Sequence, residues 1–240
     1  MRDKIELLLY GWSLGLIGGF VSWMLRITGR LVVLGYQRKK LDPRGRGLIV
    51  FTNHPSPAEP IVAASLFFPW FLFSPRYMPF GLCACEYYRK WWFLPFRRIA
   101  ISIDRDSRRG MLHSNRDVER IVGEGRIVVI HPEEERDYIG GDDGTRYSRT
   151  GKRMKSFRRG TRRIFLYSHC VVLPVWIEGG QGVIPNKTDL ARWQFFQWPR
   201  VWNKITIKIG DPLDLSGFSK DNVLEYLENE LLELADSEVQ

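Results

Sequence analysis

Short apolar runs alternate with helical patterns along most of this chain. Compact runs rich in Val, Ile, Leu and Phe predict strands at residues 47–52, 76–83, 100–103, 126–130, 171–177 and 204–209. Apolar residues that recur with helical spacing predict helices over 60–68, 107–122, 157–167 and 219–235. Such alternation is typical of an α/β fold with a mostly parallel sheet flanked by helices.

The last predicted helix is amphipathic. Its apolar face carries Leu224, Leu227, Leu231 and Leu234, and Ser219 is the expected N-cap. Acidic residues lie largely on the other faces, at Glu225, Glu228, Glu230 and Glu233. We therefore expect a packing helix with a solvated acidic face.

The N-terminal segment is apolar over a length that matches a bilayer. Residues 7–25 form 19 consecutive positions without a charge, enough to cross a hydrocarbon core of ~30 Å. Glycines interrupt this segment, and Arg26 and Arg30 separate it from a further apolar run at 31–34. Two alternatives remain: one spanning helix, or a hairpin of two shorter helices in one leaflet.

The charge balance favours anionic partners. The chain has 36 Lys and Arg against 27 Asp and Glu, a formal net charge of +9. One segment, residues 145–163, contains no acid and these bases: Arg146, Arg149, Lys152, Arg153, Lys155, Arg158, Arg159, Arg162 and Arg163. Nucleic acid is the usual first interpretation of such a cluster.

Aromatic residues favour a membrane over nucleic acid. Aromatic runs, two of them directly beside basic residues, occur at 67–73, 87–93 and 192–200, and amphipathic rings beside cations suit the lipid headgroup layer. Core packing is the alternative for any one run. We expect a bilayer-facing surface and no nucleic acid partner.

Cysteine usage predicts neither a disulfide framework nor a metal site. The pair Cys83 and Cys85, with the distant pair His169 and Cys170, lacks the spacing of a structural zinc site. Three cysteines fit a reducing compartment, and Cys170 enters an apolar strand as a buried thiol. We expect no metal and no other cofactor.

A histidine follows the first strong strand and is the leading candidate for chemistry. His54 is followed five residues later by Glu59, and Pro55 and Pro57 exclude an ordinary helix between them. A turn in this segment brings the carboxylate to the imidazole. A histidine held by a carboxylate can take the proton of an alcohol at neutral pH, which points to acyl-transfer chemistry.

The order of further segments resembles the glycerolipid acyltransferase family. That family has a His-x4-Asp motif, a block ending in Asp-Arg, a block reading Phe-Pro-Glu-Gly-Thr-Arg and an apolar strand containing Pro. Here the first block is His54 to Glu59, and the second is residues 101–105, which end in Asp104 and Arg105. Residues 131–136 match the third block imperfectly, and residues 171–177 match the fourth.

Several departures from the family pattern bear on the candidate site. Glu59 stands where most members have Asp, and Glu134 replaces the Gly of the third block. The third block ends at Arg136 in the preferred alignment, and at Arg146 in an alternative one. Ala84 stands where members often have a Lys, which removes one expected phosphate contact.

The resemblance implies a role for each matched residue. His54 is the general base, and Glu59 orients its ring. Arg105, with Arg136, holds an anionic headgroup, and Glu133 bonds a substrate hydroxyl or holds Arg105. The basic segment, in which Lys155 is assigned to substrate binding, suits the donor.

The implied function is acyl transfer at a membrane. The chain would move a fatty acyl group from acyl-CoA or acyl carrier protein to a lysophospholipid, most simply 1-acyl-glycerol-3-phosphate. Residues 1–40 would form a membrane-associated leader and residues 41–240 a catalytic domain with its site facing the cytoplasm. The alternatives are another lyso-acceptor, such as a lyso-aminolipid or glycolipid, and a non-catalytic peripheral membrane-binding protein of the same fold.

Overall fold

The computed structural model describes residues 19–43, 45–54, 65–104, 107–133, 144–167, 170–183, 200 and 202–238. Residues 60–64 of the expected helix at 60–68, residues 192–199 of the aromatic run at 192–200 and residues 7–18 of the apolar N-terminal segment fall outside these residues.

Seven strands form the main sheet. Their order across it is β1 (Leu31–Leu34), β9 (Ile205–Ile209), β8 (Val171–Glu178), β2 (Leu48–Thr52), β5 (Ile127–Ile130), β3 (Pro79–Ala84) and β4 (Ala100–Ile103). The five strands from β8 to β4 are parallel to one another. Strands β9 and β1 are parallel to each other and antiparallel to the rest, because β9 pairs antiparallel with β8. The prediction of a mostly parallel α/β sheet is therefore confirmed.

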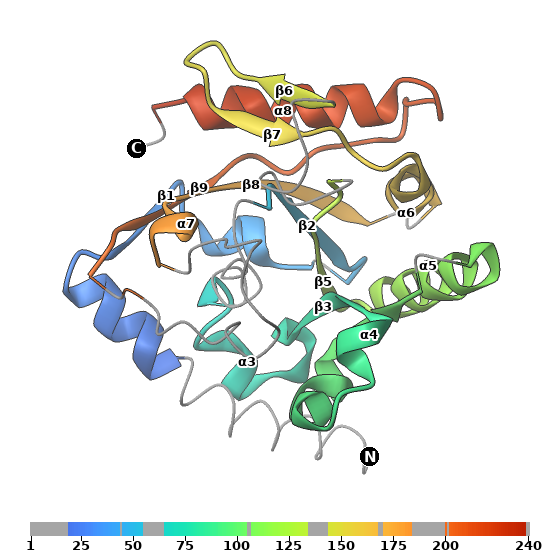
Figure 1. Ribbon diagram of the computed structural model, residues 1–240, viewed down its shortest axis with the longest axis horizontal. Helices are drawn as coiled ribbons and strands as arrows, with labels where there is room; N and C mark the ends of the chain where they lie inside the picture. The colour runs from blue at the N-terminus through green and yellow to red at the C-terminus, as the bar shows by residue number, and fades with distance from the viewer. Residues whose placement is uncertain are drawn as a thin grey trace.

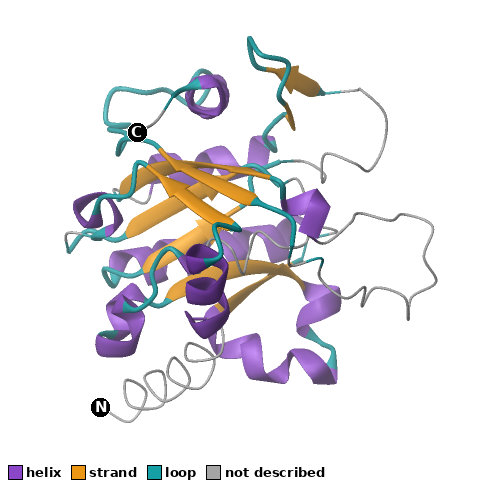
Figure 2. Cartoon of the chain, turned by 90° about the vertical axis from the view of Figure 1, so that its left-hand side faces the viewer, coloured by secondary structure: helices purple, strands orange, loops and turns teal. Residues whose placement is uncertain are grey.

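Helices cover both faces of the sheet (Figures 1 and 2). Along one face lie α8 (Val223–Asp236), α6 (Arg162–Tyr167) and α5 (Arg108–Gly123), and a helix at 19–27 and α3 (Trp70–Phe73) lie on the opposite side. Strands β2 and β5 are buried along their whole length, as expected for parallel strands covered on both sides. The shorter helices are η1 (Arg38–Leu41), η2 (Pro75–Tyr77), α4 (Cys85–Tyr88), η3 (Trp91–Ile99), η4 (Arg159–Thr161) and α7 (Gly180–Val183).

The apolar run at 31–34 belongs to the sheet. It forms the edge strand β1, which pairs in parallel with β9 from Leu31 opposite Ile205 to Leu34 opposite Lys208. This part of the segment expected as a leader is thus integral to the main sheet. A run of four β-prone residues is too short to reveal a pairing partner more than 170 positions away.

Three predicted elements begin later than expected. The helix expected from residue 219 starts at Val223, so its N-cap position is Asn222 and the prediction of Ser219 is wrong. The strand expected from residue 76 starts at Pro79, because Pro75 opens the short helix η2 just before it. The helix expected from residue 157 starts at η4 and α6, because Phe157 forms an antiparallel bridge with Glu133 and stays extended.

A hairpin formed by β6 (Thr145–Tyr147) and β7 (Arg153–Lys155) packs against α8 (Figure 1). Arg146 of the hairpin pairs with Glu228 of α8. Glu228 is buried, and it also accepts a hydrogen bond of 2.5 Å from the Phe157 N–H. The expectation of a fully solvated acidic face on this helix is therefore wrong at Glu228, because a basic hairpin covers it.

Two lysines close the C-terminal end of α8. Lys152 Nζ donates to the Ala235 carbonyl at 2.7 Å, and Lys208 Nζ donates to the carbonyls of Ala235 and Ser237 at 2.6 and 2.7 Å. Cations suit a helix C-terminus, where carbonyl groups lack partners within the helix. Burial lowers the pKa of Lys208 from its usual value.

The helix at 19–27 packs through a glycine. A Cβ on Gly19 would lie 1.9 Å from the Phe68 ring, so only glycine permits this approach. Over the described part of the chain, no helix combines the length and the apolar character needed to cross a membrane.

Asp236 gives the hairpin contact a pH dependence. Hydrogen bonds from the side chains of Thr150 and Ser148 lower the pKa of Asp236 to about 2. An aspartate in an unfolded chain has a pKa of about 3.9, so the ionised group favours the folded state above that pH. This contribution is lost as the pH falls from about 4 to about 2.

We expect Asp236→Asn to lower the thermal midpoint at neutral pH and to converge with the wild type at about pH 2. Melting curves of the purified protein across this pH range measure the difference. Asp221→Asn, at an exposed position before α8, is the matched control. A difference that stays constant down to pH 2 contradicts the assignment.

Candidate active site

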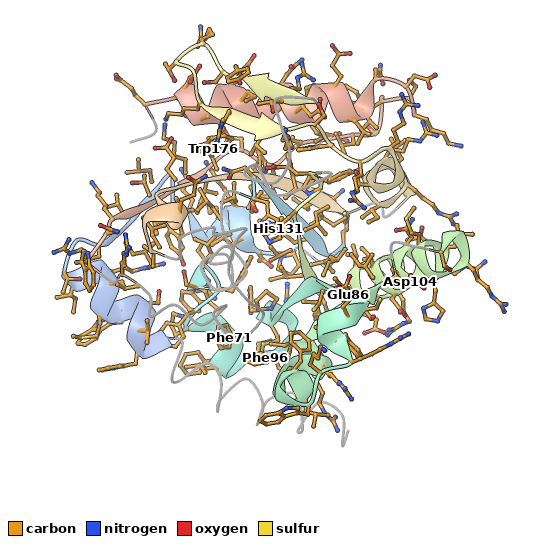
Figure 3. The ribbon with its side chains drawn as sticks, viewed as in Figure 1. Phe71, Glu86, Phe96, Asp104, His131 and Trp176 are labelled. Carbon is orange, nitrogen blue, oxygen red and sulfur yellow. The ribbon has the colours of Figure 1, made fainter. Side chains whose placement is uncertain are left out.

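The carboxyl ends of the parallel strands bring polar residues to one edge of the sheet. His54 follows β2, His131 and Glu133 follow β5, and Asp104 follows β4. Ligand sites in open α/β sheets form at this edge. Figure 3 shows His131 near the middle of the molecule and Glu86 and Asp104 close to each other to its right. Glu86 lies in α4, directly after β3, and Asp104 directly follows β4.

Glu133 ties three segments together. Only 4% of its surface is exposed, and its Oε1 accepts a hydrogen bond of 2.7 Å from the backbone N–H of His54. Its Oε2 accepts one of 3.2 Å from the backbone N–H of Lys155 in β7. One buried carboxylate thus positions the start of the His54 loop relative to β5 and to the hairpin.

His131 fixes the ring of His54. The two rings are stacked, with their centroids 4.6 Å apart and their planes 16° from parallel. His131 Nδ1 lies 2.6 Å from Thr52 Oγ1. The Thr52 hydroxyl donates to the Asn53 carbonyl at 2.9 Å, so it accepts from Nδ1–H of His131. A neutral His131 then carries its lone pair on Nε2.

Asn53 anchors the backbone directly before His54. Its amide nitrogen donates to the Ile177 carbonyl at 2.9 Å, and its amide oxygen accepts from the Ile177 N–H at 2.8 Å. The side chain thereby pairs with a peptide group of β8 as a neighbouring strand would. This buried pair of bonds extends the β2–β8 contact beyond the end of the ladder.

The backbone N–H of His54 is engaged. It donates to the Glu133 carboxylate, so it is not available as a donor to a bound substrate.

Three of the predicted site residues lie together. His54, Glu133 and Lys155 are joined through the Glu133 carboxylate, and Lys155 is buried with 4% of its surface exposed. Glu59, Arg105 and Arg136 lie outside the described residues. Arg146, the alternative end of the third block, pairs with Glu228 of α8.

Sequence reasoning missed the supporting residues Thr52, Asn53 and His131. Thr52 and Asn53 directly precede His54, and His131 opens the third block where the family pattern has Phe. That substitution was the available signal. The stack itself joins residues at the ends of two separate strands, which no local pattern reveals.

The structure supports neither a cysteine nucleophile at Cys170 nor a metal site among the described residues. Burial raises the pKa of the Cys170 thiol to about 12, so it is not a nucleophile at neutral pH. Among the described side chains, no group of three or more His, Cys, Asp or Glu residues is arranged to hold a metal ion.

Comparison with known proteins identifies relatives. A protein-family model described as Acyltransferase matches residues 35–178. Among solved structures, the chain resembles the 1-acyl-sn-glycerophosphate (LPA) acyltransferase PlsC from Thermotoga maritima. That match has a TM-score of 0.57 and 19% identity, and it covers 98% of this chain and 97% of the other. At this identity the likeness shows the fold alone. A search of curated proteins finds no significant match.

The buried Glu133 carboxylate predicts a large stability effect. Glu133→Gln replaces one acceptor oxygen with an N–H group that faces a backbone N–H, and we expect a loss of about 2 kcal/mol or more in unfolding free energy. Denaturant unfolding measures it. Glu124→Gln removes a carboxylate from two surface ion pairs and should cost less than about 1 kcal/mol. Equal losses in the two variants would contradict the anchoring role.

Proposed function

This chain belongs to the acyltransferase family, and from that premise we propose that it transfers a fatty acyl group from an acyl thioester to the hydroxyl of a lysolipid. The proposed acceptor is 1-acyl-glycerol-3-phosphate. The single observation that carries the proposal is the anchored, stacked imidazole of His54 at the carboxyl edge of the sheet. The four blocks of the sequence and the acceptor named for the structurally similar PlsC support it.

The chemistry requires one base. His54 accepts the proton of the acceptor hydroxyl as that oxygen attacks the thioester carbonyl carbon. The C–S bond of the resulting tetrahedral intermediate then breaks, and the leaving thiolate takes the proton back from the imidazolium. The products are the acylated lipid and the free thiol, with no covalent enzyme intermediate and no cofactor beyond the thioester donor.

The surroundings of His54 suit this role. A general base must keep its ring at a fixed angle to the hydroxyl, because proton transfer depends on alignment. The His131 stack restrains the ring plane, and Glu133 restrains the backbone. Glu59 completes the proposal as the carboxylate that orients the imidazole and stabilises its cation.

The acceptor headgroup is assigned to the far side of the same edge. Strands β2 and β4 are three positions apart in the sheet, which separates their ends by about 14 Å at about 4.8 Å per strand. Arg105 follows β4 in sequence, and an arginine side chain is long enough to span part of such a distance. We assign Arg105, with Arg136, to the anionic headgroup, where guanidinium groups make charge-assisted hydrogen bonds.

A second candidate acceptor is a lyso-aminolipid. Ala84, the last residue of β3, brings no cation to the edge, and the exposed Glu86 follows it. Asp104 directly follows the adjoining strand β4. Carboxylates at two neighbouring strand ends favour a headgroup that carries an amine. Nothing about Ala84, Glu86 or Asp104 specifically favours a glycolipid acceptor.

We further propose that the protein works at a membrane, held by the part of residues 1–40 that precedes strand β1, with its site facing the cytoplasm. The described part of that leader exposes large apolar side chains, including Ile27 at 63% of its surface. Phe73 and Trp91 are exposed to 75% and 80% in α3 and η3. Exposed rings next to Arg and Lys suit the headgroup layer.

His54→Ala tests the catalytic proposal. Removal of the base should lower acyl transfer by about 100-fold or more. Consumption of the thioester by membranes that carry the protein measures it. His113→Ala is the matched control, because His113 is an exposed histidine that contacts Asp117 of its own helix. Equal turnover in the His54→Ala variant and the wild type would end the enzymatic interpretation.

Arg105→Ala tests the headgroup assignment. Loss of a charge-assisted contact should raise the KM for the acceptor about tenfold or more and leave the KM for the donor unchanged. Arg200→Ala, at an exposed position, is the control. A panel of lysophosphatidic acid, lyso-aminolipid and lyso-glycolipid acceptors separates the two candidate functions. An unchanged acceptor KM in Arg105→Ala would remove the assignment.

A further inference from the structure

The basic segment 145–163 divides into two parts with different roles. Its first part is engaged by acids of the fold: Arg146 pairs with Glu228, and Lys152 pairs with Glu178. Arg149 lies 3.8 Å from Asp236. Arg146 and Lys152 hold the hairpin on α8 and β8, so these two cations are not available to a partner.

The second part meets further arginines on α5. Arg159 and Arg162 lie on η4 and α6, and Arg109 and Arg116 lie on α5. Arg162 is half-buried and the other three are exposed. Within the described part of the chain, none of these four makes an ion pair. We call them the arginine patch.

Two contacts hold the arginine patch together. A Cβ on Gly160 of η4 would lie 3.3 Å from Met111 Cε of α5, so the two elements touch at this point. Arg163 of α6 pairs with Glu119 of α5 at 3.3 Å. Figure 1 shows α5 and α6 next to each other on the right of the molecule.

The arginine patch lies at the rim of the candidate active site. The Arg158 N–H, one residue before Arg159, donates to the Pro132 carbonyl at 2.8 Å. Pro132 lies between His131 and Glu133 in the chain. Helix α5 begins four residues after Asp104, so its first turn also starts at this edge.

The charge on α5 is distributed unevenly. Its first turn contains Arg108 and Arg109 and no acid, an arrangement that the helix dipole disfavours. Farther along, Arg120 pairs with Asp117 at 3.2 Å and with Glu124 at 3.3 Å. Arg109, which is exposed and makes no ion pair with another described residue, therefore lies at the end of the helix next to the site, where it lowers the stability of the helix and favours an anionic partner.

We propose that the arginine patch docks an acidic acyl carrier protein, which delivers its thioester to His54. This inference rests on the proposed function. The four guanidinium groups are spread over two elements, and Arg109 and Arg116 are about 10 Å apart along the helix axis. Leu112, 38% exposed, lies between these two arginines in the chain. A broad cationic surface of this kind matches the acidic face of a protein, whereas a compact phosphate group needs donors that converge on one point.

The arginine patch acts on the association of the carrier protein and not on the acyl-transfer step. Exposed charges around a docking surface raise the association rate and make it sensitive to ionic strength. They make no contact with the reacting atoms. Loss of the arginine patch therefore raises the KM for a carrier-protein donor and leaves kcat unchanged.

The test compares two donors in the purified full-length enzyme with the acceptor saturating. In the Arg109→Glu, Arg116→Glu variant we expect the KM for acyl carrier protein to rise about tenfold or more, and its salt dependence to weaken. The KM for acyl-CoA should change less than about twofold, because its phosphates bind elsewhere. Arg200→Glu with Lys204→Glu, both at exposed positions, changes the net charge equally and is the matched control.

Fluorescence anisotropy of labelled acyl carrier protein measures binding without turnover. If the Arg109→Glu, Arg116→Glu variant does not fold, the Arg109→Ala, Arg116→Ala variant replaces it. Weaker binding in the patch variants alone supports the proposal. An equal rise in KM for both donors would assign the arginine patch to a phosphate group and overturn the proposal. Unchanged binding in the patch variants, or a wild type that binds no carrier protein, would also overturn it. A wild type that binds carrier protein but transfers no acyl group contradicts the proposed function instead.

Discussion

The candidate site depends on one buried carboxylate. A parallel sheet brings strand ends together, but it leaves the backbone N–H groups beyond each end without ladder partners. Glu133 satisfies the one at His54, and its second oxygen accepts from the N–H of Lys155 in the hairpin. Because a buried carboxylate costs free energy unless it accepts hydrogen bonds, the three segments stabilise one another. The position of His54 is thus set by a residue 79 positions away.

Around this anchor, the supporting contacts come from both neighbours of β2. From β8, Ile177 pairs with the Asn53 amide, and from the end of β5, His131 stacks on His54. The backbone and the ring of His54 are therefore restrained by separate contacts. A residue restrained in this way reaches the alignment that proton transfer requires without reorganisation.

Composition alone does not tell which basic and aromatic side chains pack inside the protein and which lie on its surface. Part of the basic segment holds the hairpin on α8, and another part lies at the rim of the site. The aromatic run at 67–73 divides in the same way: Phe67 is fully buried, whereas Phe73 is 75% exposed. Residues of one type within one run thus serve packing and surface contact side by side.

The sequence by itself determined the α/β class, most strands of the sheet, the acyltransferase family and the positions of His54 and Glu133 at strand ends. These features follow from local patterns, because strand periodicity and motif order are properties of neighbouring residues. The pairing of His54 with Glu59 stays a prediction. Only the tertiary structure decided that Glu133 binds the backbone of His54, that His131 stacks on its ring, that residues 31–34 join the sheet and that Glu228 is buried. Each of these contacts joins segments far apart in the chain, and such partners are selected by packing, which a local pattern does not specify.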